Sequence, residues 1–437
     1  MYHHPDIKVY GLLFRTLLAR PDLRSSVRVF SRMYESLEED PGWRLNTNHP
    51  EREDFNYLKL VARQLRLGDD GDPEFHGSFR WIFGNLEDDL FGYDMFKAHA
   101  TFNSLITSIV LILATQIQVA AIDVDDGLYR RKNWEPFDGQ FIQPFPYLPR
   151  YLTQKKTSFD SIRAIIFRNP YHYMPDNLGL YRLAFIFPAL PNVRHVLFQH
   201  LAGDRPQYYV ADKCEGIRLR PELDWTALQS LDNLSFHTCA RHNGPIPYIG
   251  IQDLVQKCKS LSRLMFRFKY PDKPDLFSPV DLVRAILPAE KTLVSLELFC
   301  SIAKIPHQLD ITLLDKTIKQ FINLTRLVLD EQLFCHHWTS TAGDCPDTCL
   351  VDVLPQTVTD LTVRRHDKYK AVPDIIRLGG ETRSGNFPCL AKLQIYVLND
   401  LGELYFHWHQ NEHLFDSQYL LHGSLQNSGR KYSMHWS

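Results

Sequence analysis

A short pattern of apolar residues recurs along this chain, with apolar side chains at its first, fourth and sixth positions. This apolar phrase occurs nine times, beginning at Val119, Ile162, Val193, Leu231, Leu261, Leu293, Leu324, Val358 and Leu390. Alternate residues of an extended strand point to opposite sides, so the fourth and sixth positions share one side and the third, fifth and seventh share the other. Each phrase therefore predicts a short strand with one buried side and one solvent-facing side.

A second pattern, with the spacing of an α-helix, precedes several of the phrases. The clearest sets of apolar residues on one helical face are Leu180, Leu183, Ala184 and Phe187; Ile251, Leu254, Val255 and Cys258; and Leu314, Ile318, Phe321 and Ile322. Ser278, Pro279 and Asp281 add a helix start signal, namely an N-cap serine, a proline at the first helical position and an early carboxylate. The predicted unit is a helix, a short loop and a short strand.

These units repeat at intervals of about 30 to 43 residues, and the phrase is similar to the leucine-rich-repeat signature. Stacked units of this kind place one strand per repeat on the inner side and one helix per repeat on the outer side. The sequence therefore predicts an α/β fold, a leucine-rich-repeat solenoid (horseshoe) with parallel β-strands on the concave face and helices on the convex face.

Four regions follow from where the pattern starts and ends. Residues 1–35 are expected to form an N-terminal helix and a first repeat-like strand, which Leu23, Val27 and Val29 indicate. Residues 36–104 are expected to be an elaborated early repeat or insertion, and residues 105–397 the leucine-rich-repeat array. Residues 398–437 are aromatic and histidine-rich, and we expect a C-terminal cap and tail, because a solenoid needs its last repeat covered.

Composition and charge exclude several kinds of partner. A formal net charge of −2 and a pI near 6.8 give no general attraction to nucleic acid or to an anionic membrane. The longest apolar stretch, residues 105–114, is shorter than the roughly 20 residues of a membrane-spanning helix and predicts a buried helix. The first residues lack a secretory signal and the eight cysteines have no regular spacing, so an intracellular protein, cytoplasmic or nuclear, with reduced thiols is expected.

Two segments carry a resemblance to a known family. The run from Leu12 to Leu23, continuing to Val29, resembles the segment that follows the F-box in fungal F-box/leucine-rich-repeat proteins, and the run from Val353 to Val363 resembles their strand unit that opens with leucine and proline. In that family the F-box docks on the Skp adaptor of a cullin ubiquitin ligase, and the repeats present a target protein. The residues before Val9 contain no F-box motif. The resemblance thus implies either a ligase substrate-recognition subunit whose F-box lies outside this chain or a repeat protein that acts alone.

The solvent-facing positions of the phrases are the expected binding surface. Positive, aromatic and flexible apolar side chains gather there in the middle and C-terminal repeats, a composition typical of protein-binding hot spots. The candidate partner-binding residues are Arg263, Met265, Arg267, Phe299, Arg326, Arg364, Lys392 and Tyr396. They predict a protein partner with an acidic or phosphorylated segment. The alternative is an ordinary solvated sheet face that carries scattered charges.

Other chemistry has weaker support in the sequence. The candidate zinc ligands are Cys335, His337, Cys345 and Cys349, whose spacing is wider than in common zinc motifs. They leave a zinc-binding or enzyme-like protein as a second alternative. His407, His409 and His413 are expected to pack within the cap.

No motif of a catalytic site is present in the sequence. There is no nucleophile elbow and no phosphate-binding loop, and Gly379, Gly380 and Gly385 predict a turn-rich connector. The expectation is a non-catalytic protein-interaction module with no cofactor and no catalytic residues.

Overall fold

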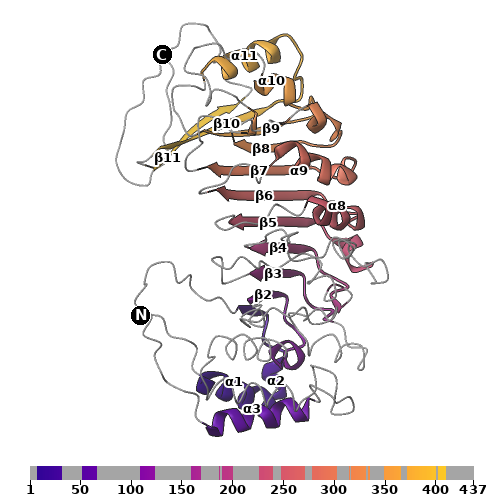
Figure 1. Ribbon diagram of the computed structural model, residues 1–437, viewed down its shortest axis with the longest axis vertical. Coiled ribbons are helices and arrows are strands. Elements are labelled where there is room, and N and C mark those ends of the chain that lie inside the picture. The colour runs from indigo at the N-terminus through magenta and orange to yellow at the C-terminus, as the bar shows by residue number, and fades with distance from the viewer. Residues whose placement is uncertain are drawn as a thin grey trace, which may run out of the picture. The chain divides into compact units, whose positions relative to one another are not determined.

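The computed structural model describes residues 7–31, 52–65, 109–123, 159–168, 187, 189–199, 226–239, 248–270, 278–302, 314, 316–330, 333–334, 349–365, 372–399 and 402–409. The chain divides into two compact units, Met1–Leu231 and Asp232–Ser437. In each unit, parallel strands are paired in chain order and accompanied by helices (Figure 1). The predicted α/β class with parallel strands is confirmed.

In the part of the first unit that the structure describes, there are four short parallel strands. They are β1 (Val29–Ser31), β2 (Val119–Asp123), β3 (Ala164–Arg168) and β4 (His195–Gln199), each hydrogen-bonded to the next. Its helices are α1 (Ile7–Ala19), α2 (Pro21–Arg24), α3 (Arg52–Gln64) and the 3₁₀ helix η5 (Thr226–Ser230). Residues 109–113 are also helical and largely buried, as the apolar stretch predicts.

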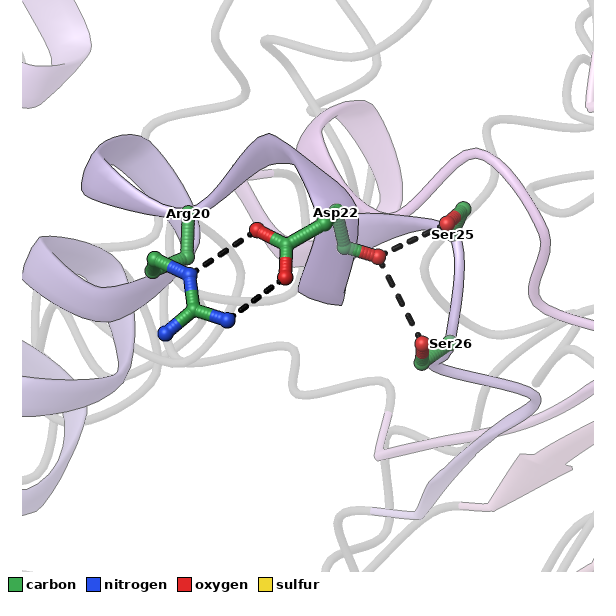
Figure 2. Close-up of polar contacts among 4 residues, drawn as sticks. All are labelled: Arg20, Asp22, Ser25 and Ser26. Atoms are coloured by element: carbon green, nitrogen blue, oxygen red, sulfur yellow. Dashed lines mark hydrogen bonds and ion pairs between the residues drawn. The ribbon is translucent and has the colours of Figure 1, made fainter.

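The junction between α1 and α2 is a tight polar turn. Arg20 donates two hydrogen bonds to the Asp22 carboxylate, Nε to Oδ1 at 3.0 Å and Nη2 to Oδ2 at 2.6 Å (Figure 2). The hydroxyls of Ser25 and Ser26 donate to the Asp22 carbonyl oxygen. Pro21 occupies the start of α2, where a missing N–H costs nothing, so the sequence Arg20-Pro21 ends one helix and begins the next.

Among its described residues, the second unit has seven strands. Six of them are parallel, namely β5 (Asn233–Cys239), β6 (Arg263–Tyr270), β7 (Ser295–Ile302), β8 (Arg326–Asp330), β9 (Asp360–Arg365) and β10 (Lys392–Asn399). The seventh, β11 (Gly402–His409), is antiparallel to β10. The helices are α8 (Tyr248–Lys257), α9 (Pro279–Ile286), η7 (Leu287–Ala289), η8 (Lys316–Gln320), α10 (Cys349–Val353) and α11 (Val372–Arg383).

The core is built from the apolar positions of the phrases. Leu264, Leu296 and Leu327 hold the fourth position of three consecutive phrases, are aligned across β6, β7 and β8, and are at most 1% exposed. Full burial of one such side chain stabilises the fold by roughly 1.5–3 kcal/mol. In the first unit the sixth-position rings of Phe167 and Phe198 stack with their centroids 5.6 Å apart. The alternation predicted from the sequence thus selects the buried side of the strands in both units.

One backbone carbonyl per repeat fixes the spacing of the strands. The carbonyl oxygen of Ser262 accepts hydrogen bonds from the N–H groups of Val294 and Ser295, at 2.8 and 2.9 Å. The carbonyl oxygen of Val294 likewise accepts hydrogen bonds from the N–H groups of Thr325 and Arg326, at 2.9 and 3.0 Å. The arrangement recurs at the second position of other phrases in both units, so each strand begins at the third position of its phrase.

Two predicted helices form largely as expected, and a third is a 3₁₀ helix instead of an α-helix. In α8, Ile251, Leu254, Val255 and the following Cys258 are all at most 4% exposed. The Ser278 hydroxyl oxygen accepts from the Asp281 N–H at 3.2 Å and caps α9, and α8 and α9 lie next to each other (Figure 1).

The third predicted helix, η8, is a 3₁₀ helix, and Ile322 is 57% exposed. The helix ends at Gln320, so Ile322 lies beyond it in the turn before β8, and its expected burial on a helical face is wrong.

Two strands of the first unit are registered differently from the sequence prediction. In β2, Ala120 rather than Ile122 is aligned with Ile165, so this phrase begins at Ile117, two residues earlier than predicted. A shift of two keeps the same residues on the same face, which is why alternation alone could not detect it. In β1 the buried residue is Phe30, whereas Val29, expected in the core, is 62% exposed.

The C-terminal region adds a strand that the phrases do not predict, and the glycine connector differs from expectation. Within the region expected to form the cap, β11 pairs antiparallel with β10, and Trp408 is aligned with Leu393 and His407 with Gln394. His413 lies outside the described residues. Gly379 and Gly380 belong to α11 rather than to a connector, and Gly385 follows that helix with φ of 85°, a conformation that glycine adopts without strain.

Candidate functional site

The candidate binding residues form three aligned columns across the second unit. We call the third, fifth and seventh phrase positions of β5 to β10 the polar face. Its third-position column is Asn233, Arg263, Ser295, Arg326, Asp360 and Lys392, each residue aligned with the next. The fifth-position column is Ser235, Met265, Glu297, Val328, Thr362 and Gln394. The seventh-position residues are His237, Arg267, Phe299, Asp330, Arg364 and Tyr396. The structure therefore brings all eight candidate residues onto adjacent strands.

The polar face is not open along its whole length. Arg263, Arg267 and Arg326 are exposed, and Met265 and Phe299 are half-buried. Four residues expected to face solvent are instead almost fully buried, namely Ser295 at 8%, Val328 at 4%, Asp330 at 1% and Thr362 at 6% exposed. The expectation of a uniformly solvent-facing surface is wrong over β8 and β9, and the exposed part of the face is centred on β6.

Long side chains that reach across neighbouring strands help to explain this burial. Arg364 on β9 extends over β8 to Phe299 on β7, with its Cζ 4.7 Å from the ring centroid. Its aligned neighbour on β8 is Asp330, which lies under this bridge. Thr362 donates from Oγ1 to Oε1 of Gln394 at 3.3 Å, which links β9 to β10. Cross-strand contacts of this kind stabilise a sheet face while they cover the shorter residues between them.

Phe299 lies at the meeting point of two guanidinium groups. The Cζ of Arg267 is 4.9 Å from its ring centroid, and the Cζ of Arg364 is 4.7 Å from the same centroid. Guanidinium groups are attracted to aromatic faces through the ring quadrupole, by about 0.5–1 kcal/mol at exposed sites. The two arginines therefore have a common anchor on the polar face.

His237 begins the seventh-position set beside Arg267. Burial, and then the charge of Arg267, lower the pKa of His237 from 6.5 to about 4. Both causes disfavour the imidazolium, so His237 is neutral at physiological pH. It contributes no positive charge to the surface.

Charge on the polar face is partly compensated within the face itself. It holds five arginine and lysine residues against three carboxylates. Arg326 pairs with Glu297 at 3.3 Å, and Lys392 pairs with Asp360 at 3.2 Å. Among the residues that the structure describes, Arg263 forms no ion pair. On this face β6 therefore presents two exposed arginines, Arg263 and Arg267, with Met265 between them and no carboxylate.

The internal ion pairs are the feature that sequence reasoning missed. Glu297 and Asp360 were placed on this face but not recognised as partners of Arg326 and Lys392. A search for opposite charges at adjacent column positions would have found them, because these positions are neighbours once the register is fixed.

The remaining candidate residues are placed only in part. Tyr396 is aligned with Arg364, and nothing further is described for it. Cys349 begins α10, whereas Cys335, His337 and Cys345 lie outside the described residues. Within the described ranges, no three His, Cys, Asp or Glu side chains are grouped so as to hold a metal ion.

Comparison of the sequence with models of known protein families and with curated proteins gives no match. In the part of the chain that the structure describes, no helix combines the length and the apolar character needed to cross a membrane.

Proposed function

We propose that this protein is a non-catalytic protein-interaction module, a leucine-rich-repeat solenoid whose polar face binds an acidic segment of a protein partner. The observation that carries the proposal is the pair of exposed arginines on β6, where Arg263 and Arg267 flank Met265 on one side of the strand and β6 places no carboxylate on that side. An extended acidic segment matches such a surface, because carboxylates pair with guanidinium groups and apolar parts of the segment pack against methionine.

The choice of partner follows from charge and shape together. Arg326 and Lys392 already have carboxylate partners on neighbouring strands, so they contribute less free charge. Arg267 is held against Phe299, and its planar guanidinium group has the geometry that matches a carboxylate. A protein segment rich in glutamate or aspartate supplies several carboxylates at strand spacing. Such a segment can therefore pair with both Arg263 and Arg267 on β6.

The test uses a fluorescein-labelled oligoglutamate peptide and fluorescence anisotropy at low ionic strength. The wild-type protein is expected to bind it, and the triple variant R263E/R267E/R326E is expected to bind at least about tenfold more weakly, because each lost or reversed surface pair is worth about 0.2–1 kcal/mol. Circular dichroism and thermal unfolding establish that the variant is folded.

The matched control is K259E/K291E/K319E. It makes the same change of charge at three exposed lysines outside the strand columns and should leave the affinity within about twofold. Equal losses in both variants would show that only net charge matters and would contradict the proposal, as would a wild-type protein that does not bind the peptide.

A further inference from the structure

Phe299 occupies an unusual position for an aromatic residue on the polar face of a sheet. Its backbone lies in β7, its side chain is half-buried on the side opposite to the core, and the adjacent residue Leu298 is 1% exposed on the core side. An aromatic ring on this side adds no packing to the core. Its contacts are instead with charged side chains from two other strands.

We infer that Phe299 is a positioning residue of the polar face, which holds the guanidinium groups of Arg267 and Arg364 in place for the acidic segment of the partner. This inference rests on the proposed function, since it names the residue that orders the charges of the same surface. The evidence is geometric, with both Cζ atoms less than 5 Å from one ring centroid, at 4.9 and 4.7 Å.

The Arg364 side chain extends across one whole strand to contact the Phe299 ring. This side chain starts on β9 and passes over β8, above its aligned neighbour Asp330, to reach a ring on β7. A free arginine side chain samples many rotamers, and binding a partner would normally require that freedom to be lost. Since the Phe299 ring already holds Arg364, that loss of freedom is incurred on folding rather than on binding.

The contribution of Arg267 is different. It is exposed and lies on β6, directly aligned with Phe299, so the ring contact fixes the direction of its side chain next to Met265. A cation on the other side of Arg267 would repel its guanidinium, and His237, the aligned residue there, is neutral. The ring therefore orients a guanidinium that has no competing cation at the adjacent position on β5.

The matched variants are Phe299→Leu and Phe299→Tyr. Leucine keeps an apolar side chain but has no ring quadrupole, whereas tyrosine retains the ring. With the oligoglutamate probe, F299L is expected to lose about tenfold in affinity, which corresponds to about 1.4 kcal/mol, and F299Y is expected to stay within about twofold of wild type. The slope of affinity against salt concentration should be unchanged in both, because no charge is altered.

A second measurement separates positioning from a merely structural role. In the wild-type protein the Arg267 and Arg364 side-chain signals in nuclear magnetic resonance should show ring-current shifts and restricted motion, which F299L should lose and F299Y should keep. Thermal unfolding should be close to wild type in both variants.

Three outcomes would overturn the inference. If the wild-type protein and F299L bind the peptide with equal affinity, the proposed function stands and only the role of Phe299 is removed. Equal loss in F299L and F299Y would show that the ring face does not orient the arginines. A wild-type protein that fails to bind oligoglutamate would remove the proposed function and this inference with it.

Discussion

His237 is the residue whose environment makes the clearest prediction about pH. Its pKa of about 4 in the folded protein lies below the 6.5 of an unburied histidine, because of burial first and Arg267 second. Between these two values the unfolded chain binds a proton that the folded chain does not, so stability is present above pH 6.5 and is lost as the pH falls toward 4.

This pH effect can be assigned to His237 by substitution. His237→Gln keeps a neutral polar side chain, and the free energy of unfolding of the variant should fall less than that of wild type between pH 7 and pH 4.5. Urea unfolding at the two pH values measures the difference. The imidazole signals of His237 in a titration followed by nuclear magnetic resonance give the pKa directly, and a value near 6.5 would contradict the prediction.

Single residues also show where sequence reasoning ends. The alternation of the phrases correctly placed Leu264 and Leu296 in the core, because a strand allows only two directions for a side chain. The alternation also placed Asp330 on the opposite face, but it did not predict that Asp330 is buried. That burial depends on how far Arg364 extends across a neighbouring strand. Such contacts depend on the rotamers of long side chains, which sequence spacing does not determine.

At the level of elements, the start of α9 offers a direct test of a predicted cap. Ser278 accepts a hydrogen bond from the Asp281 N–H, which would otherwise lack a partner within the helix. Ser278→Ala should lower the free energy of unfolding by about 1 kcal/mol, with an unchanged dependence on denaturant. Ser278→Asp keeps an acceptor at the same place and should cost much less, so equal losses in the two variants would argue against capping.

The elements differ in how well their sequence defines them. The α9 start signal is local and was predicted correctly, residue by residue. The register of β2 was not, because Ile117 and Val119 both fit the first position of the phrase and a two-residue shift leaves the face pattern intact. The antiparallel strand β11 was missed because its mixture of aromatic and histidine residues does not repeat the phrase.

For the molecule as a whole, a repeat architecture predicts that damage stays close to its origin. Leu296 on β7 is fully buried, and Leu296→Ala should lower the free energy of unfolding by about 2–5 kcal/mol. Amide hydrogen exchange should accelerate most in β6, β7 and β8 and should leave β1 to β4 unchanged. Val294→Ala, at a residue that is 42% exposed, is the control and should change stability by less than about 0.5 kcal/mol.

The opposite pattern would count against a stacked array. If exchange in Leu296→Ala rose equally in the strands of both units, the chain would behave as one cooperative body without a repeat structure. If stability were unchanged, the buried leucine column would not be part of the core.

The shared carbonyl at the second position of each phrase has an evolutionary consequence. Because Ser262, Val294 and Thr325 each align the next strand through main-chain atoms, this alignment does not depend on the identity of their side chains. The connections between strands are equally free to lengthen, as their unequal lengths in this chain illustrate. Descendants of such a protein can therefore drift in both residue identity and loop size while the ladder that aligns their strands is inherited intact.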